Sequence, residues 1–486
     1  MRRTFNISTV LHLLGYLVFV IGILHLFPLG ISFLYAEHLT EGLLLSMLLS
    51  LVSGFLAMRI FANGRELSLR DGFLVVSLGW FLMACYGSLP YLFTGAIPSF
   101  VNAFFESMSG FTTTGASILA DIEAMPKALL FWRALTHWIG GMGIIVLSLA
   151  ILPLLGVGGM QLFKAEVPGP TADRLTPRIK DTARVLWLVY VGITLVEIVL
   201  LTVGGMNLFD AVSHAFATMA TGGFSTRNAS IQAFHSPYLD GVITLFMFLA
   251  GVNFALHYRF LLGRFNAYWR DFEFRVYLGI ALGATFFLTF SNFLGGIFDS
   301  IWESLRYGVF QAVSIGTTTG FVSADYERWT PLAQVLIFLL MFVGGSAGST
   351  GGGMKVMRLI VVAKQGLIEL RRLLHPQAVI PLKLGKQVIP RQVVHAITGF
   401  FLLYVGLFVI VSIVMTTLGL DLLTAIGASA SCIGNIGPGL GLVGPTDNYA
   451  FLPGIGKMIL AFTMMVGRLE IFTVLVLFTR DFWSNR

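Results

Sequence analysis

The chain has 486 residues, of which 56% are hydrophobic and only 11% are charged, and its mean hydropathy is +0.85. This composition excludes a series of soluble domains and predicts a protein that crosses a membrane many times. The net charge of +7 is unevenly spread, because 24 of the 31 Lys and Arg residues fall in alternate loops and at the two termini. By the positive-inside rule both termini face the cytoplasm. The basic charge therefore reflects the orientation of the chain in the membrane and does not indicate a nucleic-acid partner.

The apolar runs match the length of membrane helices, since a hydrocarbon core of ~30 Å takes about 20 helical residues. The first run is too long, and lacks the small-residue cleavage site, for a removable signal peptide. In chain order we expect about ten spans, near residues 7–34, 41–61, 72–95, 127–155, 185–206, 237–262, 274–297, 331–343 continuing past a break, 393–419 and 453–479.

Four shorter apolar segments stand between these spans, and a glycine-centred loop follows each. They are too short to span a membrane and suit re-entrant helices, over residues 100–111, 210–219, 300–315 and 421–433. Polar residues near their starts are expected to act as caps, namely Asn102, Asp210, Asp299 and Asp421. The loops that follow, called here the glycine loops, are TTTGAS at 112–117, ATGGFST at 220–226, TTTGF at 317–321 and GNIGPG at 434–439, centred on Gly115, Gly222, Gly320 and Gly437.

Four such loops, roughly 100 residues apart, indicate backbone segments that converge on one axis. Rings of backbone carbonyls of this kind build cation filters. We therefore predict an all-α polytopic membrane protein with four M1–pore-loop–M2 repeats around a central pore. The units are a two-span N-terminal unit, 1–70, and repeats at 71–160, 161–266, 267–375 and 376–486.

This arrangement resembles the Trk/Ktr/HKT superfamily of potassium transporters, and within it the bacterial H-subunits of Trk systems. The resemblance rests on the four single-glycine loops and the extra N-terminal hairpin, and it covers the whole chain. It implies potassium bound by backbone carbonyls next to each filter glycine. The implied binding residues are Thr113, Thr114, Gly115, Ala220, Thr221, Gly222, Thr318, Thr319, Gly320, Asn435, Ile436 and Gly437, with Thr112 as an outer contributor.

Two details of these loops bear on selectivity. Ala220 and Ile436 carry no polar side chain, which favours backbone coordination. In plant members of the superfamily a serine at the first filter glycine accompanies sodium transport, so Gly115 favours potassium. The fourth loop departs most from the others, with Asn435 in place of a threonine and Pro438 after the glycine.

The run GGSAGSTGGGMK at 344–355 interrupts the span after the third glycine loop. A run so rich in Gly and Ser does not remain helical, and at mid-span it must line a cavity. Lys355 is not followed by Ser or Thr, so the run is not a phosphate-binding loop. The resemblance implies a gate beneath the filter, with a passive kink as the alternative. Its residues are Gly344, Gly345, Ser346, Ala347, Gly348, Ser349, Thr350, Gly351, Gly352 and Gly353 within a loop of 344–354, here called the Gly/Ser loop.

Arg468 is a charge inside the last span, where it is costly and faces a pore or a partner. We expect it to hold the Gly/Ser loop through backbone carbonyls or to repel cations when the pore is closed. The alternative is a structural pair with a buried acid such as Glu197. Arg133 lies nearer the outer end of its span and is expected to be structural.

The predicted function is potassium uptake across a bacterial inner membrane; a proton-coupled potassium symporter with alternating access stays open as the alternative. Cys85 and Cys432 have no metal-site spacing, and no catalytic triad is present, so we expect no enzyme. The only expected ligand is the transported potassium ion, with no nucleotide bound by this chain. The resemblance implies a homodimer in the lipid bilayer, regulated by a cytosolic, nucleotide-binding TrkA-like subunit.

Overall fold

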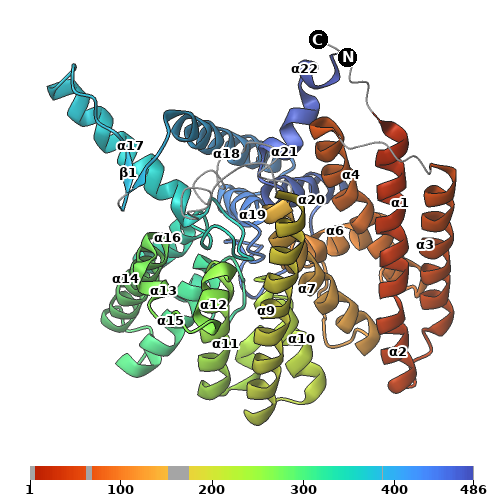
Figure 1. Cartoon of the computed structure of the whole chain (residues 1–486). Coiled ribbons are helices and arrows are strands. Elements are labelled where there is room, and N and C mark those ends of the chain that lie inside the picture. The colour runs from red at the N-terminus through yellow and green to blue at the C-terminus, as the bar shows by residue number, and fades with distance from the viewer. Residues whose placement is uncertain (1–5, 62–67, 151–174, 386, 485–486) are drawn as a thin grey trace.

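The computed structural model describes residues 6–61, 68–150, 175–385 and 387–484, and these residues are mostly helical (Figure 1). The described strands are β1 (Lys383–Leu384) and β2 (Gln387–Val388), which form a short antiparallel hairpin. The expected all-α fold is confirmed. The predicted boundary at residue 160 lies outside the described residues.

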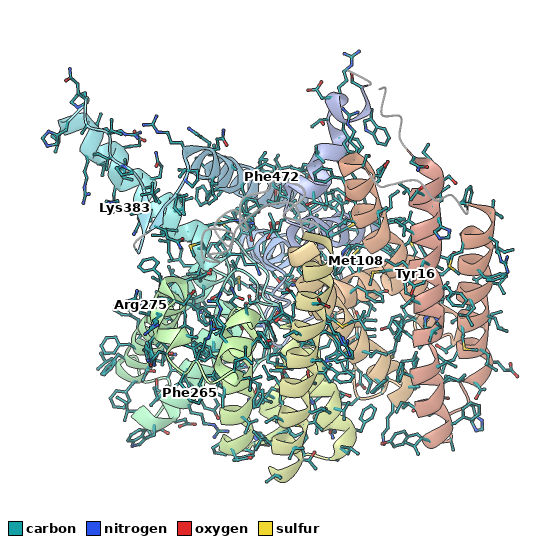
Figure 2. All side chains as sticks on the ribbon, in the orientation of Figure 1. Tyr16, Met108, Phe265, Arg275, Lys383 and Phe472 are labelled. Atoms are coloured by element: carbon teal, nitrogen blue, oxygen red, sulfur yellow. The ribbon has the colours of Figure 1, made fainter. Side chains whose placement is uncertain are left out.

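The N-terminal unit is a helical hairpin whose two arms approach closely. α1 (Ile7–Leu24) and α2 (Leu26–Leu34) together make one candidate span, and α3 (Thr40–Ile60) makes the next. Glycines permit the contact, because a Cβ at Gly54 would lie 2.5 Å from the backbone nitrogen of Phe19. The outer side of α1 is apolar and open, with Tyr16 59% exposed (Figure 2). That is the surface expected of a helix in lipid.

The four predicted repeats are numbered below in chain order. In their described parts, the first two each combine long helices with one short buried helix. The first consists of α4 (Leu69–Gly87), α5 (Leu89–Phe93), α6 (Phe100–Phe111) and α7 (Lys127–Ala150). The second consists of α9 (Leu175–Val203), α10 (Leu208–Met219), η1 (Ser230–Phe234), α11 (Pro237–Ala250) and α12 (Phe254–Leu261).

The last two repeats follow the same order. The third consists of α13 (Ala267–Arg270), α14 (Phe272–Leu294), α15 (Ile301–Gly316), η2 (Tyr326–Arg328), α16 (Pro331–Leu340) and α17 (Val356–Leu374). The fourth consists of α18 (Arg391–Thr417), α19 (Leu422–Gly434), α20 (Gly454–Arg468), α21 (Phe472–Leu475), η3 (Val476–Phe478) and α22 (Arg480–Trp483).

The described residues contain seven helices long and apolar enough to cross a membrane, or nine if each bent pair is one span. The two bent pairs are α11 with α12, at 101°, and α20 with α21–η3, at 112°. These pairs fall on the spans expected at 237–262 and 453–479, and the sequence did not predict their bends. Backbone conformation explains the second bend, since Glu470 and Ile471 both have positive φ, which no helix accommodates. The span expected at 331–343 and past a break begins as the ten-residue α16 and continues as α17 after the Gly/Ser loop.

The four short segments are helices as predicted, namely α6, α10, α15 and α19, and their C-terminal halves are buried. Met108 of α6, for example, is 1% exposed and lies inside the molecule (Figure 2). The predicted caps are mostly wrong. Asp421 caps α19 through the amide of Thr424, whereas Asn207 caps α10 and Ser300 caps α15. Asn102 instead accepts a hydrogen bond from the ammonium group of Lys457.

One end of the molecule carries the start of α1, the short C-terminal helix α22 and the long helix α17, which projects away from the body (Figure 1). α17 is amphipathic in sequence, with Arg371 and Arg372 in its last turn. The opposite end carries α2 (Figure 1). The multiple apolar helices and buried short helices together describe a multi-pass membrane protein.

Candidate ion pathway

The glycine loops share one backbone pattern. In each loop two residues separated by one position have positive φ, and the residue between them does not. The four pairs are Thr113 and Gly115 (52° and 84°), Thr221 and Gly223 (54° and 76°), Thr318 and Gly320 (65° and 79°), and Asn435 and Gly437 (55° and 103°). Positive φ costs a non-glycine residue roughly 1–2 kcal/mol, so four repetitions of it indicate a conformation required by function.

This pattern corrects the register of the second loop. We expected its central glycine to be Gly222, but the residue equivalent to Gly115 is Gly223. Gly222 takes the position of Thr114, and Ala220 takes that of Thr112. The turn hydrogen bonds agree, since the amide of Gly222 donates to Ala217 as the amide of Thr114 donates to Ser109.

The four loops close into a ring through contacts at these glycines. A Cβ added to any of the four would overlap a carbonyl oxygen of another loop, from the residue that precedes its own glycine. Gly115 meets Gly222 O, Gly223 meets Thr319 O, Gly320 meets Ile436 O and Gly437 meets Thr114 O. The chain of contacts therefore runs from repeat 1 to 2, 3, 4 and back to 1. A side chain at any of these positions would push the ring apart.

The two ends of the loops face different surroundings. The four glycines line a hollow on one side together with residues that follow them, among them Ser117, Ser225, Val322 and Pro438. On the other side, Gly434 O accepts a hydrogen bond from Gly353 of the Gly/Ser loop. Thr112 is equivalent to Gly434 in the backbone pattern. It therefore lies at the end toward the Gly/Ser loop, which corrects our expectation of an outer contributor.

Threonine hydroxyls in the loops are largely engaged by protein groups. Thr112 Oγ1 donates to Met108 O at 2.6 Å and lies 2.8 Å from Thr114 Oγ1, and Thr317 and Thr319 form the same pair at 2.7 Å. Asn435 Nδ2 donates to Thr114 Oγ1 at 2.9 Å. These hydroxyl and amide groups hold the backbone of the loops in place.

A second ring of hydrogen bonds joins neighbouring repeats on the side of the hollow. Arg133 forms a buried pair with Glu106 at 2.8 Å and donates to Ser225 O, as its expected structural role requires. The remaining links are the amide of Ile231 to Val322 O, Tyr326 Oη to Gly439 O, the amide of Gly441 to Glu327 Oε1, and the amide of Tyr449 to Ser117 O. This outer ring connects all four repeats.

The Gly/Ser loop lies directly against the inner end of the glycine loops. Its Gly352 amide donates to Thr318 Oγ1 at 2.7 Å, and its Gly353 amide donates to Gly434 O at 3.0 Å. Gly344, Gly348 and Gly353 have positive φ, so the loop is not a helix, as predicted. It is bonded to groups of three repeats and is buried over most of its length.

Thr350 is the most strongly held residue of this loop. Its hydroxyl lies 3.0 Å from Met219 O and 3.1 Å from Ala250 O. Its carbonyl accepts a hydrogen bond from Arg468 Nη1 at 2.7 Å, while Arg468 Nη2 lies 3.5 Å from Gly140 O. Arg468 is 2% exposed. It thus holds a carbonyl of the Gly/Ser loop, and within the described residues it forms no ion pair with Glu197.

Sequence reasoning missed several residues around this loop. Glu470 forms an ion pair with Arg358 at 2.5 Å, and Glu273 accepts two backbone amides from the loop and the helix after it. The available sequence signal for Glu470 and Glu273 was an acidic residue near the end of a predicted span. His137 stacks on Phe224, with the ring centroids 4.0 Å apart, and lies against Gly222, and within the described residues neither of its ring nitrogens has a hydrogen-bond partner.

Comparisons with known proteins agree with this architecture. The profile of the family TrkH, described as cation transport protein, matches residues 38–485. The Trk system potassium uptake protein TrkH of Escherichia coli strain K12 is 43% identical over 86% of this chain and 87% of its own. That of Halomonas elongata is 41% identical over 99% and 100%. The crystal structure of the potassium transporter TrkH from Vibrio parahaemolyticus superposes with a TM-score of 0.91, at 38% identity over 99% of this chain and all of that one.

Proposed function

The chain belongs to the TrkH family of cation transport proteins, and from this premise we propose that it takes up potassium through the glycine loops. The observation that carries the proposal is the closed ring of contacts in which each filter glycine meets a carbonyl of another repeat. Carbonyl oxygens fixed in such a ring replace the hydration shell of a cation. With the corrected register, the coordinating carbonyls belong to Thr113, Thr114, Thr221, Gly222, Thr318, Thr319, Asn435 and Ile436, next to Gly115, Gly223, Gly320 and Gly437.

The driving force is the membrane potential. An inside-negative potential favours cation entry by about 2.3 kcal/mol per charge per 100 mV. The protein then needs no chemical energy source of its own, and the chain acts as a transporter and not as an enzyme.

The Gly/Ser loop is the gate of this pathway. Its bonds to Thr318 and Gly434 hold it at the inner end of the glycine loops, where it obstructs an ion that leaves them. Arg468 stabilises the obstructing conformation, because its guanidinium donates to Thr350 O and lies near Gly140 O. Opening requires these bonds to break, and a regulatory partner supplies the free energy.

We further propose the assembly and location that the family resemblance implies. The chain forms a homodimer in a bacterial inner membrane, with both termini cytoplasmic, and binds a cytosolic TrkA-like, nucleotide-binding subunit. This partner binds at basic segments that hold much of the charge on the expected cytoplasmic side, at 164–184, 259–275 and 364–391.

A proton-coupled symporter is the second candidate, and one observation favours it. Glu197 of α9 is fully buried, and within the described residues neither carboxylate oxygen has a hydrogen-bond partner. A buried acid inside a membrane is a common proton carrier. Potassium-driven acidification measured in vesicles separates the candidates, because a symporter with Glu197→Gln loses the proton movement and a channel never shows it.

The experiment that tests the proposed function is single-channel recording of the purified protein in a bilayer with opposed potassium and sodium gradients. We expect discrete openings whose reversal potential follows potassium. A reversal potential that follows neither cation, or flux without discrete openings, would overturn a channel-like pathway.

A further inference from the structure

Glu273 is a buried carboxylate bound to backbone amides at both ends of the Gly/Ser loop region. It is the second residue of α14 and is 5% exposed. Its Oε1 accepts hydrogen bonds from the amide of Ala347 at 2.8 Å and from the amide of Met357 at 3.1 Å. Ala347 lies near the start of the loop and Met357 lies just beyond its end, so one oxygen connects the two ends of the loop. These two ends, residues 345–347 and 356–357, are called here the loop neck.

The neck is closed at the same place by the main chain. The amide of Val356 donates to Gly345 O at 3.1 Å, and Lys355 between loop and helix has a positive φ of 70°. Three hydrogen bonds therefore tie residues 345–347 to residues 356–357. Two of the three end on Glu273.

Glu273 also satisfies a donor that α17 cannot satisfy itself. The first amides of a helix have no partner within it, and Lys355, the N-cap residue of α17, gives no side-chain cap bond, because its ammonium group donates to Gly351 O. Met357 lies in that first turn. The acid that holds the loop neck is thus also the acceptor at the start of the helix after it.

We propose that Glu273 is the latch of the Gly/Ser loop, a positioning residue that keeps the neck closed and the loop in the obstructing conformation. This inference rests on the proposed gating function of the loop. Arg468 holds the tip of the loop from α20, whereas Glu273 holds its neck from α14. The two anchors act on different bonds, and loss of either one favours opening.

The test compares Glu273→Ala with Asp271→Asn as the matched control. Asp271 is two residues earlier and caps α14 through the amide of Phe274 at 2.7 Å, and within the described residues it forms no hydrogen bond with the loop. In single-channel recordings without a regulatory subunit, Glu273→Ala should raise the closed-to-open equilibrium constant about tenfold, which is ~1.4 kcal/mol. The potassium-to-sodium permeability ratio should stay unchanged, and Asp271→Asn should gate like the wild type.

A second variant keeps the test decisive if Glu273→Ala does not fold. Met357→Pro removes one donor to Glu273 and leaves the carboxylate in place, and proline is tolerated in the first turn of a helix. It should raise opening in the same direction, and the double variant should add little to the larger single effect. Wild-type gating in both folded variants would overturn the latch.

The outcome also separates the latch from the gate. If a shortened Gly/Ser loop opens the pore but Glu273→Ala and Met357→Pro do not, only the latch is refuted. If the shortened loop itself does not open the pore, the proposed gating role of the Gly/Ser loop is refuted.

Discussion

Arg468 and Thr350 are 118 residues apart in the chain, yet the Arg468 guanidinium donates to the Thr350 carbonyl at 2.7 Å. The contact joins the last residue of α20 to the tip of a loop in the preceding repeat. Both partners are buried, so no water replaces a donor that is removed. Removing the Arg468 guanidinium therefore costs the Gly/Ser loop its strongest hydrogen bond to the fourth repeat.

Arg468→Ala should therefore let potassium leak without a regulatory subunit. Removing a charged hydrogen bond costs roughly 1.5–3 kcal/mol, equivalent to an increase of about ten- to a hundredfold in the open population. Arg468→Lys should leak less, since it restores the charge but not the planar fork of donors. The measurement is unstimulated potassium uptake in deficient cells, normalised to the amount of protein in the membrane.

Lys457→Ala is the matched control for this variant. Lys457 is another buried cation of α20. Its ammonium group donates hydrogen bonds to Asn102 Oδ1 and Ala450 O, and neither acceptor belongs to the Gly/Ser loop. It should lower stability without a leak. A folded Arg468→Ala protein that stays silent until the partner is added would refute the gate role of Arg468.

Deleting residues inside 346–351 should raise potassium conductance and leave selectivity intact. The deletion removes the bonds of Thr350 to Met219 O and Ala250 O but none of the contacts that close the ring of glycine loops. Bilayer recordings give both quantities from one preparation. Reduced flux in a well-folded deletion would identify the loop as a structural hinge.

Gly115→Ser should admit sodium. The new Cβ would overlap Gly222 O, and serine is strained at a φ of 84°. Displaced carbonyls lose the spacing that suits potassium, and a loss of ~1.4 kcal/mol of discrimination lowers the permeability ratio about tenfold. An unchanged ratio in the folded variant would exclude Gly115 from the filter.

Glu106→Ala should destabilise the protein by roughly 3–5 kcal/mol, because it leaves the buried Arg133 charge without its partner. Replacing both residues with apolar ones of similar size should cost less, since no lone charge remains buried. Thermal unfolding in detergent compares the three proteins. Equal stability of the single and double variants would show that a lone buried Arg133 charge does not lower the stability.

The sequence was sufficient to locate the four short helices because their length and apolar character stand out between the spans. It was not sufficient to find their caps, since Asn207 and Ser300 compete with neighbouring polar residues and only the backbone decides between them. Bends after Ala250 and Arg468 also escaped prediction. There the hydropathy continues across the break, so the pattern does not mark it, and the second bend follows from the positive φ of Glu470 and Ile471.

The second glycine loop shows the same limit at a single residue. Its sequence contains two adjacent glycines, and repetition alone does not tell which one is equivalent to Gly115. Only the φ pattern assigns Gly223 to that position, with Gly222 one residue before it. The two glycines are required for different reasons, and this difference is measurable.

A Cβ at Gly222 would overlap the ring of His137, whereas a Cβ at Gly223 would overlap the backbone oxygen of Thr319. The His137 side chain can be removed by mutation, whereas the backbone oxygen of Thr319 cannot. His137→Ala should therefore restore potassium uptake to Gly222→Ala but not to Gly223→Ala, whose φ of 76° also disfavours any side chain. Uptake and the potassium-to-sodium ratio are measured for both double variants, with His137→Ala alone as the control. Equal rescue of the two glycine variants would mean that both positions face the His137 ring, and the corrected register of the second loop would then be wrong.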